Sequence, residues 1–200
     1  MLDALLSLVF PRACIGCDRD DVLLCEACAR GVGTSDTLTH DGLAMYGCLP
    51  YAGILRAAIG DFKRGRRAFA RDFATLLLPY VDEHMTLVPI PTTRRRCAER
   101  GFDQTVLLAE MLRGRCNVRV ARLLGRCGSA AQQGRSRSER LASVGRFFVR
   151  ADDSASGGTL TLFDDVRTTG ATLVDAAHTL RNAGFEIRRA LTLAWAPKEK

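Results

Sequence analysis

The chain alternates between segments whose apolar residues recur at helical spacing and short, continuous apolar runs. Residues 54–84 show the three- and four-residue spacing of a helix, interrupted near Gly65, and residues 102–114 show the same spacing up to a glycine. The apolar runs at 85–91 and 159–165 are short and bounded by loop residues, so they predict buried strands. The first of them is expected to run into a loop that its two prolines fix, and this loop carries Arg94–Arg96 and Arg100.

The C-terminal part of the chain continues this alternation. Residues 171–184 predict a helix that ends at Gly184, and residues 185–196 predict a last strand. Shorter strands are expected within 31–50 and 117–126. Strands that alternate with helices are typical of an α/β fold with a mostly parallel sheet flanked by helices, and this is the fold class we expect.

Four cysteines near the N-terminus form two CxxC pairs, Cys14 with Cys17 and Cys25 with Cys28. Two such pairs bring four thiolates into the tetrahedral arrangement that zinc prefers. Disulfides and a [4Fe–4S] cluster are the alternatives. A reducing compartment disfavours disulfides, and the spacing differs from that of common ferredoxins. We therefore expect a small structural zinc ribbon here.

The first ten residues, MLDALLSLVF, are apolar but contain Asp3 and lack both a basic flank and a small-residue cleavage site. They are too few to span a bilayer. We expect a helix that packs on the protein, no membrane insertion and a cytoplasmic location. The expected domains are an N-terminal helix with a zinc-ribbon module at 1–48 and a larger domain at 49–200.

Positive charge is concentrated in the middle of the chain. The formal net charge is +7, and residues 88–150 contain fourteen arginines, no lysine and four acidic residues. A basic block of this kind suits phosphates, either on a small substrate or along a nucleic acid. A solvated surface in an arginine-rich chain is the alternative for any single arginine.

Two adjacent carboxylates, Asp164 and Asp165, end an apolar run and directly precede VRTTGAT. Ligands of α/β sheets bind beyond the carboxyl ends of the strands. The segment after the acids supplies helix N-terminal amides, threonine hydroxyls and a flexible glycine, which together suit a phosphate. Carboxylates beside a phosphate are favourable when they accept hydrogen bonds from a diol or hold Mg²⁺. We therefore expect this segment to bind a ribose 5-phosphate unit. An apolar run that ends in aspartate also describes a Walker B strand, but the chain contains no GxxxxGK[ST], so we exclude that alternative.

The stretch LTLFDDVRTTGAT resembles the phosphoribosyl pyrophosphate (PRPP) signature of type I phosphoribosyltransferases, and the chain as a whole resembles the ComF/GntX family. Three further segments carry this resemblance: FKRGRR at 62–67, VPIPTTRRRCAERGFDQTVLLAE at 88–110 and QQGRSRSERLASVGRFF at 132–148. The chain departs from the family pattern at Asp103, where asparagine is usual.

The resemblance implies a type I phosphoribosyltransferase-like fold and a PRPP site that uses Mg²⁺. It implies that Asp164 and Asp165 are catalytic, because they would bind the ribose hydroxyls or the Mg²⁺-bound sugar. The residues that it implies for the 5-phosphate are Arg167, Thr168, Thr169, Gly170, Ala171 and Thr172. The residues that it implies for pyrophosphate binding or for a flexible loop over the site are Arg94, Arg95, Arg96, Arg100, Gln132, Arg137 and Arg140.

Three functions are consistent with these features. The first is enzymatic transfer of a phosphoribosyl group from PRPP to an acceptor that the sequence does not identify. The second, implied by the family name, is a non-catalytic module of DNA uptake during competence that contacts single-stranded DNA or a helicase partner. The third is a PRPP sensor that keeps the site without turnover.

Overall fold

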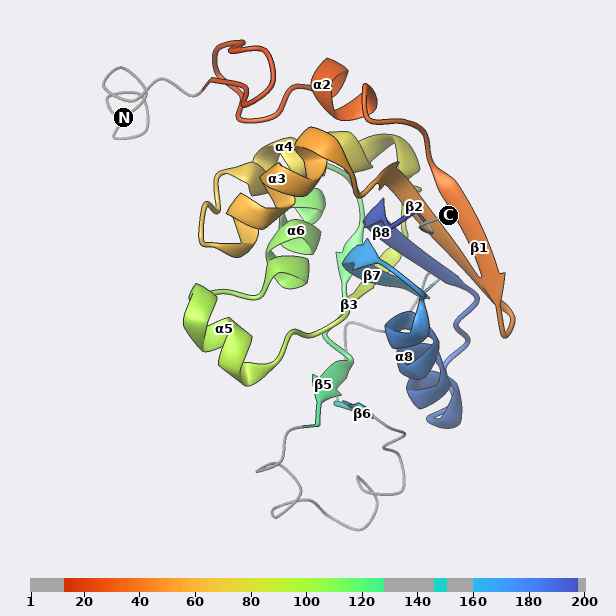
Figure 1. Ribbon diagram of the computed structural model, residues 1–200. Coiled ribbons are helices and arrows are strands. Elements are labelled where there is room, and N and C mark those ends of the chain that lie inside the picture. Colours follow the sequence, from red (N-terminus) through yellow and green to blue (C-terminus); the bar gives the residue numbers. More distant parts are fainter. Residues whose placement is uncertain (1–12, 128–145, 151–159, 198–200) are drawn as a thin grey trace.

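The computed structural model describes residues 13–127, 146–150 and 160–197, and a six-stranded sheet forms its centre (Figure 1). The strand order is β1 (Asp36–His40), β2 (Leu43–Pro50), β8 (Arg189–Trp195), β7 (Leu160–Arg167), β3 (Thr86–Pro89) and β4 (Arg119–Val120). Only β1 runs antiparallel to its neighbour within this sheet. The expected mainly parallel sheet is therefore confirmed. A separate antiparallel pair consists of β5 (Leu124–Arg126) and β6 (Phe147–Val149).

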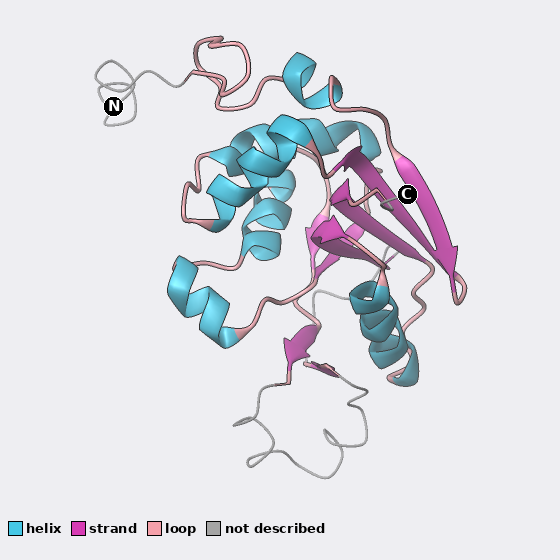
Figure 2. Ribbon diagram, viewed as in Figure 1, coloured by secondary structure: helices cyan, strands magenta, loops and turns pink. Residues whose placement is uncertain are grey.

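Helices cover both faces of the sheet (Figure 2). On one face lie α3 (Gly53–Lys63), α4 (Phe69–Leu77) and α6 (Gln104–Arg113), and on the other lies α8 (Ala171–Asn182). Successive residues of a strand point to opposite faces, so Phe163 packs with the first group and Leu162 with α8. A hydrophobic cluster therefore packs on each face of β7. These two clusters fix the strand that carries the paired carboxylates.

A short helix, α5 (Arg94–Arg100), follows β3 where the sequence led us to expect a loop. The segment has no amphipathic spacing, and none of its residues is buried. Its ends explain why it forms. The hydroxyl of Thr93 accepts a hydrogen bond of 3.3 Å from the Arg96 N–H, and Gly101 ends the helix at a φ of 74°.

The cysteine-rich segment at the N-terminal end packs against α3 and α4 (Figure 1). It includes the short helix α2 (Glu26–Arg30), and the 3₁₀ turn η1 (Leu78–Tyr80) follows α4. The carboxylate of Asp72, on α4, accepts hydrogen bonds from the backbone N–H groups of Leu23 and Leu24, at 2.8 and 3.2 Å. Both leucines are buried, so this contact fixes the segment to the helices below it.

Strands β1 and β2 pair with the central sheet although nearly all of their residues fall in the stretch 1–48. The division of the chain at residues 48 and 49 stays a prediction. The N-terminal helix expected at residues 1–10 lies outside the described residues, as does most of the polar segment that follows β5. Within the described ranges, no helix combines the length and the apolar character needed to cross a membrane.

Candidate functional site

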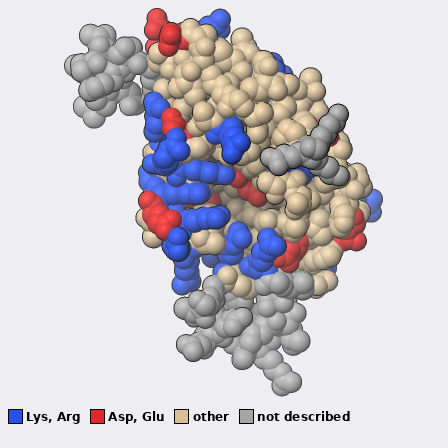
Figure 3. All heavy atoms as spheres, in the orientation of Figure 1, with Lys and Arg blue, Asp and Glu red and all other residues tan. Residues whose placement is uncertain are grey.

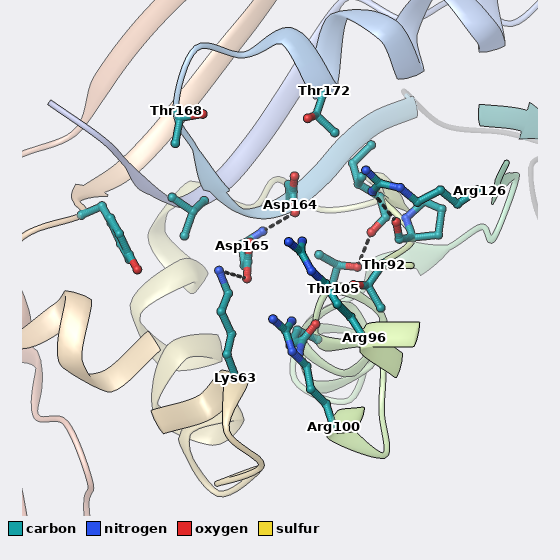
Figure 4. A pocket seen from close by; sticks show the side chains of 15 residues that line it. Lys63, Thr92, Arg96, Arg100, Thr105, Arg126, Asp164, Asp165, Thr168 and Thr172 are labelled. Carbon is teal, nitrogen blue, oxygen red and sulfur yellow. Dashed lines mark hydrogen bonds and ion pairs between the residues drawn. The ribbon is translucent and has the colours of Figure 1, made fainter. Parts of the chain in front are cut away.

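A cavity of about 340 Å³ opens at the carboxyl ends of β3 and β7 (Figure 4). Side chains from β7, from the loop that follows β3, from α3, α5, α6 and α8, and from β5 line it. Acidic, hydroxyl and cationic groups share this one cavity. The lining residues are Tyr51, Lys63, Ile90, Pro91, Thr92, Arg96, Arg100, Gln104, Thr105, Arg126, Asp164, Asp165, Val166, Thr168 and Thr172.

The paired carboxylates lie within β7, because this strand continues two residues beyond Asp165 instead of ending there. Lys63 Nζ lies 2.9 Å from Asp165 Oδ2, and the Asp165 N–H donates to Asp164 Oδ1 at 2.8 Å. Burial, and then the neighbouring charge of Asp165, raise the pKa of the Asp164 carboxyl well above its ordinary value. A cation or a hydroxyl donor at Asp164 would therefore relieve an unfavourable charge.

The turn between β7 and α8 presents hydroxyl and backbone groups to the same cavity. Thr168 and Thr172 line it, and Gly170 between them is the N-cap of α8. Gly170 has a φ of 83°, and a Cβ atom there would lie 2.8 Å from Met45 Sδ, so this tight turn requires glycine. A glycine N-cap has no side chain to accept from the first helical turn, and this favours an anion at this end of the helix.

Three arginines form the cationic side of the cavity. Arg96 and Arg100 come from α5, and Arg126 comes from β5. The guanidinium of Arg126 donates to the Pro91 carbonyl at 3.1 Å and lies over the Phe147 ring, 5.3 Å from its centroid. Burial lowers the pKa of this guanidinium, and nearby arginines lower it further. Figure 3 shows lysine and arginine side chains gathered around this mouth, with acidic atoms recessed between them.

Several residues that the resemblance implied for ligand binding lie elsewhere. Arg167 is almost fully buried and forms an ion pair with Asp36 of β1. Thr169 and Ala171 line a separate hollow of about 290 Å³. Arg94 and Arg95 are exposed on α5 and are not among the described residues that line the cavity. Three further residues lie outside the described part of the chain: Gln132, Arg137 and Arg140.

The cavity also contains residues that were not among the site residues expected from the sequence. Lys63 is the only lysine before residue 198, and a single lysine in so arginine-rich a chain could have marked it as a candidate site residue. Arg126 carried no distinguishing signal among the arginines around it. Gln104 is 2 % exposed, and its Nε2 has no acceptor within the described structure. A buried amide of this kind is suited to a ligand oxygen.

The four cysteines of the CxxC pairs come together, with all their sulfur atoms within 4.8 Å of one another. Cys17 Sγ and Cys25 Sγ lie 3.7 Å apart, close to the spacing of about 3.8 Å that follows from tetrahedral zinc–sulfur bonds of about 2.3 Å. The backbone N–H groups of Cys25 and Cys28 donate to Cys14 Sγ and Cys25 Sγ. Backbone donors of this kind orient thiolate ligands, so the cluster is suited to a metal ion.

The thiols of this cluster influence one another's ionisation. Burial alone would raise the pKa of Cys14, but backbone hydrogen bonds from Cys25, Gly16 and Cys17 outweigh it and lower the pKa to about 6. At Cys28, the side-chain interactions with Cys25 and then Cys17 raise the pKa to about 12. Four thiolates this close therefore need a cation to offset their mutual repulsion.

Two curated proteins are similar to this chain in sequence. Competence protein ComFC of Bacillus subtilis is 38% identical over 140 residues, which are 67% of this chain and 56% of that protein. Competence protein ComFC of Streptococcus pneumoniae is 31% identical over 125 residues, which are 62% of this chain and 53% of that protein. The chain thus spans about half the length of the curated relatives that it matches.

No family model matches the chain. A solved hypoxanthine phosphoribosyltransferase from Staphylococcus aureus covers 65% of this chain and 74% of its own, with a TM-score of 0.34 and 10% identity. The family resemblance seen in the sequence motifs agrees with the identity to the two ComFC proteins. The chain is therefore a homologue of the ComFC competence proteins over the stretch that it shares with them.

Proposed function

We propose that the chain binds PRPP, or a related ligand with a ribose 5-phosphate unit, in the cavity at the ends of β3 and β7. The observation that carries this proposal is that one cavity contains the Asp164–Asp165 pair, Thr168 of the turn after β7, Thr172 of the first turn of α8, and three arginines. A sugar diol suits the carboxylates, a monophosphate suits the start of α8, and a diphosphate suits the arginines.

We further propose that the bound group is transferred to an acceptor. In such a transfer the bond between C1 of the ribose and the pyrophosphate oxygen breaks, and pyrophosphate leaves with the electron pair. The acceptor forms the new bond to C1 and loses a proton to solvent. Positive charge develops on the sugar ring during this step, so nearby carboxylates stabilise it, while Arg96, Arg100 and Arg126 stabilise the departing diphosphate.

Mg²⁺ fits the acidic end of this cavity, because the adjacent carboxylates of Asp164 and Asp165 line it and supply the oxygen ligands that this ion prefers. Asp164 would hold the ion together with ligand oxygens, and the ion would neutralise charge on the leaving diphosphate. Lys63 already compensates Asp165, so the two acids have different surroundings and would have different roles.

Zinc is the metal that we propose for Cys14, Cys17, Cys25 and Cys28. The ligand set is all sulfur, which suits zinc better than magnesium or calcium. With four protein ligands the metal would have no open position, so its role would be to fold the N-terminal segment onto α3 and α4.

Calorimetric titration of the purified protein with PRPP and Mg²⁺ tests the binding proposal. We expect saturable binding, with pyrophosphate released only when a suitable acceptor is also present. No heat above the dilution blank, at protein concentrations where micromolar affinity is measurable, would contradict the assignment of the ligand.

A role in DNA uptake is a second candidate, and the names of the two curated relatives favour it. The arginines around the cavity mouth, several of them exposed, would suit the phosphates of single-stranded DNA. In that case a labelled oligonucleotide should bind with an affinity that falls steeply as salt is raised. PRPP binding without any oligonucleotide binding at low salt would exclude direct DNA contact.

A further inference from the structure

Helix α5 carries two of the three cavity arginines but has little packing of its own. None of its residues is buried, and in Figure 1 it lies away from the sheet, joined to the rest of the molecule through its two ends. Arg96 and Arg100 nevertheless face the cavity, as Figure 4 shows. Whatever fixes the ends of α5 therefore determines where these two guanidinium groups lie.

The first end is held by Asp103, the N-cap residue of α6. Its Oδ2 accepts from the backbone N–H of Thr92 at 2.9 Å, just before α5 begins. Its Oδ1 accepts from the backbone N–H of Thr105 at 3.2 Å and lies 2.8 Å from the hydroxyl of the same residue. One carboxylate thus ties the segment that enters α5 to the start of α6.

These contacts give a physical reason for an acid at position 103. Both oxygens face backbone N–H donors, and a carboxylate can accept on both. An asparagine has one acceptor oxygen and one NH₂ group, so its NH₂ would face a donor and one hydrogen bond would be lost. Asparagine can therefore cap α6 or hold Thr92, but it cannot do both equally well.

The second end is held by Arg67, in the turn between α3 and α4. Its guanidinium donates to the carbonyl oxygen of Gly101, the residue that ends α5. The same group lies over the ring of Phe102, 4.8 Å from its centroid. Phe102 in turn packs on the buried Phe62, with 5.3 Å between the ring centroids, so this contact reaches the core.

We propose that Asp103 and Arg67 are positioning residues that hold α5 so that Arg96 and Arg100 are aligned for the diphosphate part of the ligand. This inference rests on the proposed function, because it assigns the α5 arginines to one part of PRPP. Without the two anchors, binding a diphosphate would require ordering of the helix and of both side chains, which costs affinity. The ribose 5-phosphate part, held by β7 and α8, would be unaffected.

The test uses the full chain with Arg67→Met, Asp103→Asn and Asp103→Ala. Each variant is titrated with PRPP, pyrophosphate and ribose 5-phosphate, always with Mg²⁺. We expect Arg67→Met and Asp103→Ala to weaken PRPP and pyrophosphate about tenfold while ribose 5-phosphate changes by less than about twofold. Asp103→Asn should lie between wild type and Asp103→Ala. Arg71→Met, which removes an exposed charge from the adjacent α4, is the control for Arg67→Met and should change nothing.

An equal loss of affinity for all three ligands would overturn the proposal, because it indicates general destabilisation instead of positioning. Unchanged affinity for pyrophosphate would overturn it as well. Hydrogen exchange of the unliganded variants separates this inference from the proposed function. If α5 is held as we infer, amides of residues 92–101 exchange faster in Arg67→Met and Asp103→Ala even if wild type binds none of the ligands. Exchange at the wild-type rate would show that other contacts position the helix.

Discussion

Lys63 and Asp165 form an ion pair of 2.9 Å at the cavity, and they connect the end of α3 to the end of β7. The two side chains are largely but not fully buried, with exposures of 28% and 14%. Lys63 therefore decides how much negative charge the acidic end of the cavity presents. It belongs to the candidate site as much as the two aspartates do.

Substitution Lys63→Met is expected to separate the binding of a cation from the binding of PRPP. Loss of the ammonium leaves Asp165 uncompensated beside Asp164, so Mn²⁺ alone should bind more tightly, while PRPP affinity should fall about tenfold. Calorimetry with PRPP and Mg²⁺, and titration with Mn²⁺ followed by electron paramagnetic resonance, measure the two effects. Weaker binding of both, with Arg71→Met unchanged, would show that Lys63 acts only by supporting the fold.

The raised pKa of Asp164 predicts a stability that depends on pH in the absence of ligand. The folded protein binds this proton more tightly than the unfolded chain, so the free energy of unfolding falls as pH rises from the ordinary aspartate range toward the raised value. At pH values well above the ordinary aspartate range, Asp164→Asn removes the cost of ionising this buried carboxyl. We expect this variant to melt about 3 °C higher than wild type at pH 7.5, with no gain near pH 4.

Thermal melts of wild type and Asp164→Asn over this pH range are the measurement. A variant that melts lower than wild type at pH 7.5 would mean that the ionised carboxylate is stabilised by protein contacts. The site would then not be poised for a cation or a diol.

The contact of Asp72 with the backbone of Leu23 and Leu24 predicts a coupling between the cysteine-rich segment and α4. Asp72→Ala leaves two buried N–H groups without an acceptor, which costs roughly 2–3 kcal/mol of unfolding free energy. Urea unfolding measures this loss, and Glu83→Ala, which removes an exposed acid, is the matched control. Equal stability of Asp72→Ala and wild type would show that the segment is not anchored through this carboxylate.

One zinc ion per chain is expected in freshly purified, reduced protein, and Cys17→Ser or Cys28→Ser should lose it. Cys116→Ser is a suitable control, because this thiol lies outside the cluster and its hydrogen bond to the Leu112 carbonyl suits a hydroxyl equally well. Elemental analysis with protein quantification decides the question. Metal-free wild-type protein, or zinc retained by both cluster variants, would exclude the zinc assignment.

The sequence was sufficient to predict the sheet, the strand that carries the paired acids and the cysteine cluster, because each rests on local pattern. The strand of β7, the turn at Gly170 and the start of α8 follow one another along the chain. The spacing of the CxxC pairs likewise places four sulfur atoms together with few residues between them.

The remaining features depend on how distant segments pack. The contact of Lys63 with Asp165 requires α3 to end beside β7, and no local signal encodes this crossing. Helix α5 is fixed by its caps and by Arg67, whereas the two prolines before it led to the expectation of a loop. Arg167 was assigned to the phosphate, but β7 continues through it and its side chain meets Asp36 of β1.

The most direct test of the account compares wild type with the double variant Asp164→Asn, Asp165→Asn in calorimetric titrations with PRPP and Mg²⁺. Circular dichroism and zinc content establish that the variant is folded with its cysteine site intact. We predict saturable binding to wild type and none to the variant. Equal affinity in the two proteins, or no binding by wild type, would contradict the claim that these acids face a phosphoribosyl ligand.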